Sequence, residues 1–182
     1  MPQALRLAAL WVLVAGILAP SIAHAQDDPV KQLRNIAGGS TNQVTSSVLS
    51  AGVKSCAGRI DQVANFLTKS TQSSALVFLP ERDFDNSMVS ISIEVDAQGV
   101  PRAYASATFS PNTAMGCAGM YESVQYWSES CNAVAARIFK GATPSGPLGS
   151  EIAILTIGPS ARVFMIRATS QSCVTIKKEV LR

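Results

Sequence analysis

The feature that most limits how this 182-residue chain can fold is its set of four cysteines, Cys56, Cys117, Cys131 and Cys173. In an exported chain an even number of cysteines is typical of two disulfides, for which three pairings exist. The spacings contain neither the C-x-x-C of redox enzymes nor the short knuckles of structural zinc sites. The cysteines therefore predict two structural cross-links.

The N-terminus has the pattern of a secretory signal peptide. Arg6 is followed by an apolar run over residues 7–19, and Ala23-His24-Ala25 supplies the small residues that signal peptidase requires. The run is too short to cross a bilayer of roughly 30 Å as a helix, so an uncleaved anchor is the weaker alternative. We predict that residues 1–25 are removed and that the chain folds in the bacterial periplasm, with full secretion as the second possibility.

Removal of residues 1–25 would also remove His24, the only histidine of the chain. A mature chain without imidazole excludes Ser-His-Asp and Cys-His nucleophile systems and every His-ligated metal site. The formal charge of +3 is too small for binding nucleic acid by bulk attraction, and 47% hydrophobic residues are too many for a disordered chain. We therefore predict no catalytic residue, no metal, no cofactor and no nucleic-acid partner.

The remaining chain divides into a polar leader and one domain. Residues 26–43 contain Asp27-Asp28-Pro29 and a Gly-Gly-Ser-Thr-Asn run over residues 38–42, a polar and helix-breaking composition that predicts a flexible leader, so the domain spans residues 44–182. A first helix is predicted over residues 44–70, with Gly52 and Gly58 as weak points, because apolar residues recur at steps of four and three. Those residues are Leu49, Val53, Cys56, Ile60, Val63 and Leu67.

The rest of the domain predicts strands around a second helix. Three strands are expected over residues 75–79, 89–95 and 102–109, and the middle one alternates apolar with polar residues. A helix over residues 115–140 is indicated by four-three steps through Met120, Val124, Trp127, Cys131, Val134 and Ile138. A Gly/Pro/Ser loop, a hairpin and a last strand or tail then follow, over residues 141–150, 151–157 with 162–169, and 173–181.

These elements predict an α+β fold. The expected architecture is an antiparallel sheet of about five strands, in the chain order α-β-β-β-α-β-β, packed against two helices and tied by two disulfides. A shared helix would place Cys117 and Cys131 roughly 21 Å apart, beyond the roughly 7 Å that a disulfide allows. The pairs Cys56–Cys131 and Cys117–Cys173 are favoured, and the pairing of Cys56 with Cys117 and of Cys131 with Cys173 remains open.

Two groups of carboxylates resemble functional sites. The turn over residues 81–87 places Asp83 and Asp85 at calcium-loop spacing, but Met88 stands where such a loop needs Gly. Glu122 and Glu129 lie seven residues apart on the predicted second helix, roughly 10 Å along its axis, which is slightly too far for a pair of hydrolase carboxylates. A solvated turn and a wet helix face are the favoured interpretations.

A protein interface is the favoured functional hypothesis. Its candidate residues are exposed aromatic, arginine and loop positions, namely Phe84, Arg102, Tyr104, Tyr121, Tyr126 and Leu148. The sequence thus predicts an exported, non-enzymatic protein-binding or accessory protein of inhibitor, immunity or envelope-assembly type, whose partner is another periplasmic or envelope protein. A carrier of a small apolar ligand, held over Ala103, Ala105 and Ala107, is the second hypothesis. A carboxylate-based hydrolase is the third.

Overall fold

A computed structural model describes residues 33–36, 41–68, 73–96, 99–114 and 116–181. The predicted signal peptide lies outside these residues. Over the described part of the chain, three helices accompany one antiparallel sheet, in which the short β1 extends the eight strands β2 to β9 in the order β1-β2-β3-β4-β5-β9-β8-β7-β6. The helices are α1 (Thr41–Ser50), α2 (Ala57–Thr68) and α3 (Cys131–Ile138). The strands are β1 (Leu33–Ile36), β2 (Ala75–Phe78), β3 (Val89–Val95), β4 (Ala103–Asn112), β5 (Gly116–Trp127), β6 (Thr143–Leu148), β7 (Ile152–Ile157), β8 (Ala161–Thr169) and β9 (Ser172–Leu181).

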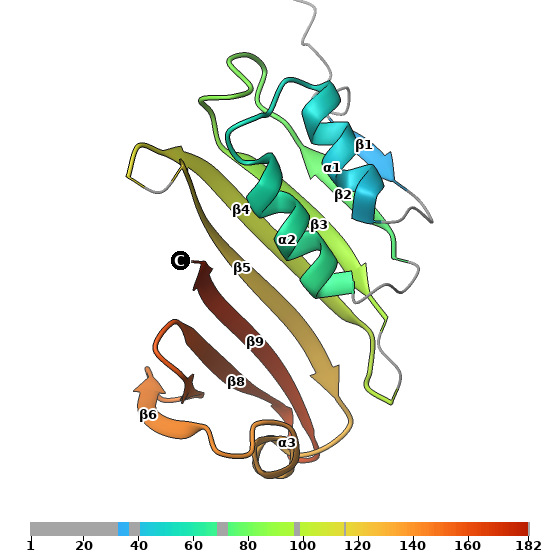
Figure 1. Cartoon of the computed structure of the whole chain (residues 1–182). Coiled ribbons are helices and arrows are strands. Elements are labelled where there is room, and N and C mark those ends of the chain that lie inside the picture. Colours follow the sequence, from blue (N-terminus) through green and yellow to red (C-terminus); the bar gives the residue numbers. More distant parts are fainter. Residues whose placement is uncertain (1–32, 37–40, 69–72, 97–98, 115, 182) are drawn as a thin grey trace, which may run out of the picture.

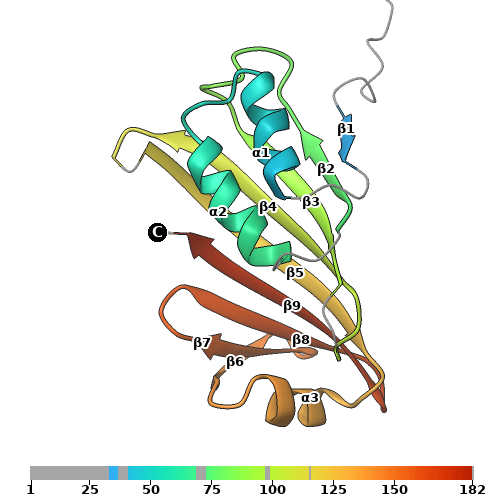
Figure 2. The same ribbon diagram turned by 45° about the vertical axis from the view of Figure 1, so that its right-hand side comes forward.

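The sheet has one covered face, which we call the inner face. In Figures 1 and 2, α1 and α2 lie over strands β2 to β5, whereas α3 lies at the other end of the sheet near β8 and β9. Side chains alternate between the two faces of a strand, and in the central strands the odd-numbered residues point inward. The register keeps them together, because Ala107 of β4 faces Tyr121 of β5 and Tyr121 faces Glu179 of β9.

Two separate cores lie on this inner face. The larger one joins α1 and α2 to β2, β3, β4 and the start of β5, and includes the fully buried Val48, Ile60, Ile91 and Phe109. The smaller one joins α3 to β8, β9 and the end of β5; its buried residues are Trp127, Val134, Val163, Met165 and Cys173. The middle of the inner face, on β5 and β9, lies between α2 on one side and α3 on the other.

The helix predicted over residues 44–70 is interrupted. The chain leaves α1 after Ser50 and enters α2 at Ala57. Gly52 lies at the break with φ +99°, a backbone conformation that Gly adopts without the steric cost of a Cβ. Val53, Cys56 and Ile60 are buried as predicted, but Leu49 is 48% exposed. Gly52 thus ends the first helix, whereas Gly58 is accommodated within the second.

The helix predicted over residues 115–140 is wrong for its first half. Residues 116–127 form β5, the strand with neighbours β4 and β9, and only Cys131–Ile138 is helical. The four-three pattern arose because both faces of β5 carry apolar side chains, with Met120 and Val124 on one face and Trp127 on the other. Ser130 then caps α3 by accepting a hydrogen bond from the backbone N–H of Ala133.

The predicted architecture is therefore corrected. The expected sheet of about five strands and two helices, in the order α-β-β-β-α-β-β, is replaced by a larger sheet and three helices. The strands predicted over residues 75–79, 89–95, 102–109, 151–157 and 162–169 are confirmed, and the tail over residues 173–181 is a full strand, β9. The loop predicted over residues 141–150 contains β6, and the leader assigned to residues 26–43 contains β1 and the start of α1.

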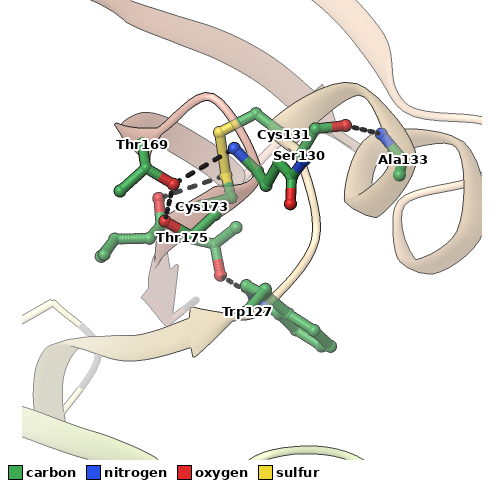
Figure 3. Close-up of a disulfide and its surroundings, with 10 residues drawn as sticks. Trp127, Ser130, Cys131, Ala133, Thr169, Cys173 and Thr175 are labelled. Carbon is green, nitrogen blue, oxygen red and sulfur yellow. Dashed lines mark hydrogen bonds between the residues drawn. A yellow bond between two sulfur atoms is a disulfide. The ribbon is translucent and has the colours of Figure 1, made fainter.

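The favoured disulfide pairing is also wrong. Cys56 at the entrance to α2 is bonded to Cys117 of β5, and Cys131 of α3 is bonded to Cys173 of β9 (Figure 3), with Cα atoms 5.1 and 4.9 Å apart. The error follows from the two predicted long helices, which placed Cys56 and Cys131 level with each other near mid-helix and Cys117 at a helix end beside the last strand. Each disulfide lies in one core and ties a helix to the sheet. Both cross-links are compatible with an oxidising, extracytoplasmic location.

The helices of the described residues are all too short, or too polar, to traverse a lipid bilayer.

Candidate functional site

The face of the sheet opposite the helices carries two continuous rows of apolar side chains. One row crosses five strands through the pairs Tyr104–Val124, Val124–Ile176, Ile176–Phe164 and Phe164–Ile154. The second row also crosses five strands, through Tyr126, Val174, Ile166, Ile152 and Leu148. We call these ten residues the outer apolar surface. The packed helices contact the other face, so in the described part of the chain this surface is open to solvent.

Several of these side chains are strongly exposed. Tyr104, Tyr126 and Leu148 have 50%, 55% and 55% of their surface accessible, and the others are half-buried by their neighbours in the sheet. The rows extend over roughly 19 Å across the strands and lie about 7 Å apart along them, given the usual spacings within a sheet. An uncovered apolar surface of this continuity is typical of a binding site.

A polar row borders the outer apolar surface on β5, β9 and β8. Glu122 and Lys178 form a salt bridge with 3.0 Å between Oε2 and Nζ. Arg162 is the next residue of the row, and its side chain donates to the carbonyl of Ala161. Within the described residues no carboxylate lies within ion-pair distance of Arg162. The border therefore carries an excess of one positive charge.

The edge strand beside this surface is poorly suited to pairing with another chain. Strand β6 is the last strand of the sheet and contains Pro144 and Pro147, with a register shift between them. Proline has no N–H to donate, and a bulge twists the edge away from a partner strand. Of the two modes of recognition open to a sheet, docking on its face is favoured over strand addition at β6.

The middle of the inner face holds a network of three ionisable side chains that the sequence interpretation missed. Lys177 Nζ donates to Tyr121 Oη at 2.6 Å and lies 3.0 Å from Glu179 Oε2, while Tyr121 Oη donates to Glu179 Oε2 at 2.6 Å. The ring of Phe66 from α2 is tilted against Tyr121, with the ring centroids 5.7 Å apart. The network thus lies where α2 meets β5 and β9.

The pKa shifts keep this network in its charged, paired form. Burial disfavours the ammonium of Lys177, but the hydrogen bonds to Tyr121 and Glu179 outweigh it and raise the pKa of Lys177. Burial, assisted by donation to Glu179, raises the pKa of Tyr121. Burial also opposes ionisation of Glu179, but hydrogen bonds from Tyr121 and Lys177 dominate and lower its pKa. A protonated lysine and a neutral tyrosine are poor nucleophiles and bases at neutral pH.

Two cavities flank Phe66 on the inner face. The first, of about 200 Å³, is lined by residues that include Val95, Val100 and Lys177. The second, of about 220 Å³, includes Arg59 and Leu181 in its lining. Phe66 and Tyr121 line both cavities, so these two rings form the partition between them.

The predicted ligand cavity over the alanine face is largely filled. Ala105 and Ala107 are buried in the larger core, with exposures of 0% and 1%. Ala103 lines the first of the cavities beside Phe66 and also a shallower depression of about 460 Å³ along β2, β3 and β4. Arg102 in that depression is paired with Glu94 and Asp96. Space for a ligand therefore begins at Ala103 and continues toward Lys177.

The acidic turn over residues 81–87 has an architectural role in the structure. Asp85 accepts hydrogen bonds from the backbone N–H groups of Ser55 and Lys54, and these bonds lower the pKa of its carboxyl. Asp83 accepts from the side chain of Asn86. Among the described residues no group of His, Cys, Asp and Glu side chains is arranged to hold a metal ion. The turn thus secures the connection between α1 and α2.

The two carboxylates considered for hydrolysis do not share a helix. Glu122 belongs to β5 and pairs with Lys178 on the outer face, whereas Glu129 precedes α3 and pairs with Arg137. Each has a cationic partner and belongs to a different part of the molecule. The common helix face predicted for them is therefore wrong, because residues 116–127 form a strand.

The structure brings three of the six predicted interface residues to one face, since Tyr104, Tyr126 and Leu148 belong to the outer apolar surface. Arg102 is tied to two carboxylates at the start of β4, and Phe84 packs partly against the larger core. Tyr121 is 3% exposed and lies on the opposite face.

The aliphatic residues of the outer apolar surface were missed, although the sequence holds a signal for them. Strand β7 reads Ile-Ala-Ile-Leu-Thr-Ile and has apolar residues at both its even-numbered and its odd-numbered positions. In β3, by contrast, Ser and Glu occupy the even-numbered positions. Apolar residues at both parities indicate a strand with two apolar faces. The Tyr121 network gave no comparable signal, because Tyr121 is 56 residues from Lys177 in the chain.

Comparison of the chain with protein-family models, with curated proteins and with solved structures finds no match.

Proposed function

We propose that this chain is an exported, non-enzymatic protein of the bacterial periplasm that binds another protein through the outer apolar surface. The observation that carries the proposal is the pair of apolar rows, each crossing five strands on the face opposite the helices. Burying such rows against a partner releases ordered water from apolar area, which is the main driving force of most protein association.

The dimensions of the surface favour an amphipathic helix of the partner as its occupant. A helix rises about 1.5 Å per residue, so about 13 residues would span the roughly 19 Å of a row. The apolar stripe of such a helix would lie on both rows, as in helix-in-groove recognition. The charge excess at Arg162 favours an Asp or Glu on the flank of that helix.

Two further observations support binding rather than catalysis. The pKa directions of Lys177 and Tyr121 leave both protonated at neutral pH, so neither is prepared for nucleophilic or base chemistry. Glu122 and Glu129, the two candidate carboxylates for hydrolysis, are each paired with a cation. The periplasmic assignment is supported by the signal-like residues 1–25 together with the two disulfides.

The first experiment locates the partner on the surface. A photo-crosslinking benzoylphenylalanine replaces Ile176, in the centre of the first row. In a control chain it replaces the exposed Asn132 on α3, which belongs to neither the outer apolar surface nor the cavities beside Phe66. We expect a cross-link in the native periplasm from position 176 only, with the cross-linked peptide of the partner belonging to an amphipathic helix that carries an acidic flank. A cross-link from position 176 to a second copy of this chain would overturn the helix as occupant.

The second experiment measures binding of that helix as a synthetic peptide. Ile176→Ser is expected to weaken the affinity at least about 10-fold, since central apolar contacts dominate interface energies. Arg162→Glu should weaken it as well, with the loss shrinking at high salt. Ser110→Ala, at the far end of β4 on the same face of the sheet, is the matched control and should bind like the wild type. Equal affinity of the wild type and Ile176→Ser would contradict the proposal.

A further inference from the structure

We infer that the inner face also holds a binding site for a small anionic ligand with an aromatic or aliphatic body, at the two cavities that Phe66 separates. This inference is independent of the outer apolar surface, since the two sites lie on opposite faces of the sheet. Its basis is the shape of the cavities, the exposure of their common wall and the charges that line them.

The cavities have a movable partition. Phe66 is 53% exposed although it faces the sheet, and its contacts with the network are a tilted ring contact with Tyr121 and a 6.0 Å approach of Lys177 Nζ to its ring centroid. A half-exposed aromatic side chain changes rotamer readily. Rotation of Phe66 would join the spaces of about 200 and 220 Å³ into one that reaches the usual range of ligand pockets, roughly 300 to 1,000 Å³.

Apolar side chains line both cavities and would contact the aromatic or aliphatic part of the ligand. Val95, Val100 and Ala103 line the first cavity, and Val63 and Leu181 line the second. The rings of Phe66 and Tyr121 lie between them, and the half-exposed ring of Phe66 offers a face for stacking. An aromatic or branched aliphatic group therefore has apolar contacts on both sides of the partition.

The charges select an anion. Lys177 is neutralised by Glu179, with 3.0 Å between Nζ and Oε2. Arg59 lines the second cavity from α2 together with Glu179, and its guanidinium donates a long hydrogen bond of 3.4 Å to the side chain of Gln62. Because Glu179 is paired with Lys177, these three groups leave one net positive charge, at Arg59. Within the described part of the chain Arg59 has no carboxylate at ion-pair distance. A carboxylate or sulfonate of the ligand would accept charge-assisted hydrogen bonds from the guanidinium of Arg59.

The test uses two fluorescent probes with related aromatic bodies. 1-Anilinonaphthalene-8-sulfonate carries an anionic group, and N-phenyl-1-naphthylamine is its uncharged counterpart. With the oxidised mature chain we expect saturable one-site binding of the sulfonate, at least about 10-fold tighter than binding of the amine. Arg59→Gln should remove that difference, because the contribution of one charge-assisted bond is about a factor of 10 or more in affinity.

Variants elsewhere separate this site from the outer apolar surface. Ser123→Leu introduces a larger side chain into the lining of the first cavity and is expected to weaken both probes. Arg162→Gln is the matched arginine control and Ile176→Ser the matched apolar control, and both should leave the sulfonate affinity unchanged. Near-ultraviolet circular dichroism verifies that each variant is folded. Loss of sulfonate binding in Ile176→Ser with retention in Arg59→Gln would place the probe on the outer face and overturn the inference.

Discussion

Trp127 and Thr175 are joined by a hydrogen bond inside the smaller core, where Trp127 Nε1 donates to Thr175 Oγ1 at 2.9 Å (Figure 3). Both residues are buried, at 2% and 3% exposure, on neighbouring strands β5 and β9. The bond allows the indole to be buried without leaving its N–H unpaired. It thereby fixes the position of Trp127, the largest side chain of the core beneath α3.

Thr175→Val should destabilise the folded chain. Valine has nearly the shape of threonine but cannot accept the indole N–H, and a buried unsatisfied donor costs about 1 to 3 kcal/mol. The measurement is urea unfolding followed by tryptophan fluorescence, which reports on this core because the other tryptophan, Trp11, belongs to the predicted signal peptide. Thr175→Ser retains the hydroxyl and should lose less. A valine variant as stable as the wild type would show that the bond contributes nothing.

Peptide mapping should identify the two disulfides individually. Each should contribute a similar free energy to the stability of the folded chain. Digestion without reduction is expected to yield linked peptides of Cys56 with Cys117 and of Cys131 with Cys173. The sequence separations of 61 and 42 residues enter the loop entropy only as logarithms, so replacing either pair by serine should cost about 2 to 4 kcal/mol. Recovery of a peptide linking Cys56 to Cys131 would refute the observed pairing.

The Tyr121 network should produce a pH dependence with two limbs. The pKa of Glu179 lies below its usual 4.5, so the stability from this group is full above that pH and falls as the pH drops through the lowered pKa. The pKa values of Lys177 and Tyr121 lie above 10.5 and 10.0, so their contribution is full below those values and falls as the pH rises further. Denaturant unfolding from pH 3 to 11 should show a plateau around neutrality.

Glu179→Gln tests the acidic limb. At pH 7 the variant should be less stable than the wild type by about 1 kcal/mol, because it loses a half-buried charge-assisted interaction, and the difference should shrink toward pH 3. Glu122→Gln on the outer face is the control, since its exposed pair with Lys178 should contribute less than about 1 kcal/mol. A Glu179→Gln deficit that is the same at pH 3 and pH 7 would argue against the network.

Two glycines should respond to alanine in opposite directions. A Cβ at Gly119 of β5 would lie 3.0 Å from side-chain atoms of Leu181 and Phe109 and 3.2 Å from the carbonyl oxygen of Thr108. Gly119→Ala should therefore cost about 1 to 3 kcal/mol through overpacking. A Cβ at Gly58 of α2 meets nothing within 4 Å, so Gly58→Ala should be neutral or stabilise by up to about 1 kcal/mol. Thermal unfolding of both variants decides the order, and a Gly119→Ala variant that is the more stable of the two would contradict the packing.

Local patterns predicted several elements correctly where one period was clear. Strand β3 alternates Val89, Ile91 and Ile93 with polar residues, and its predicted bounds, 89–95, are the observed ones. The same reasoning failed at β5, where Met120 and Val124 face outward and Trp127 faces inward, because a strand with apolar residues on both faces can imitate a helical stripe. The false helix then led to the wrong disulfides.

The residues of the candidate sites likewise fall into two groups, those that the sequence could identify and those that it could not. Tyr104, Tyr126 and Leu148 were identified because aromatic and exposed apolar residues are recognisable one by one. Their continuation through Ile176, Phe164 and Ile154 depends on the register of five strands, which the sequence does not state. The cavities beside Phe66 depend on the gap between two helical layers, and such a gap is a property of packing alone.

Some properties can be read from the amino-acid sequence alone, namely the cysteine content, the signal-like segment that contains the only histidine, and the strands whose side chains alternate cleanly. These follow from residue identity and from short-range periodicity. The tertiary structure decided which cysteines meet, which face of the sheet the helices cover, and how Tyr121 comes to lie beside Lys177 and Glu179. These depend on the strand order β4-β5-β9-β8, because the pairing of β5 with β9 brings together segments that are far apart in the chain.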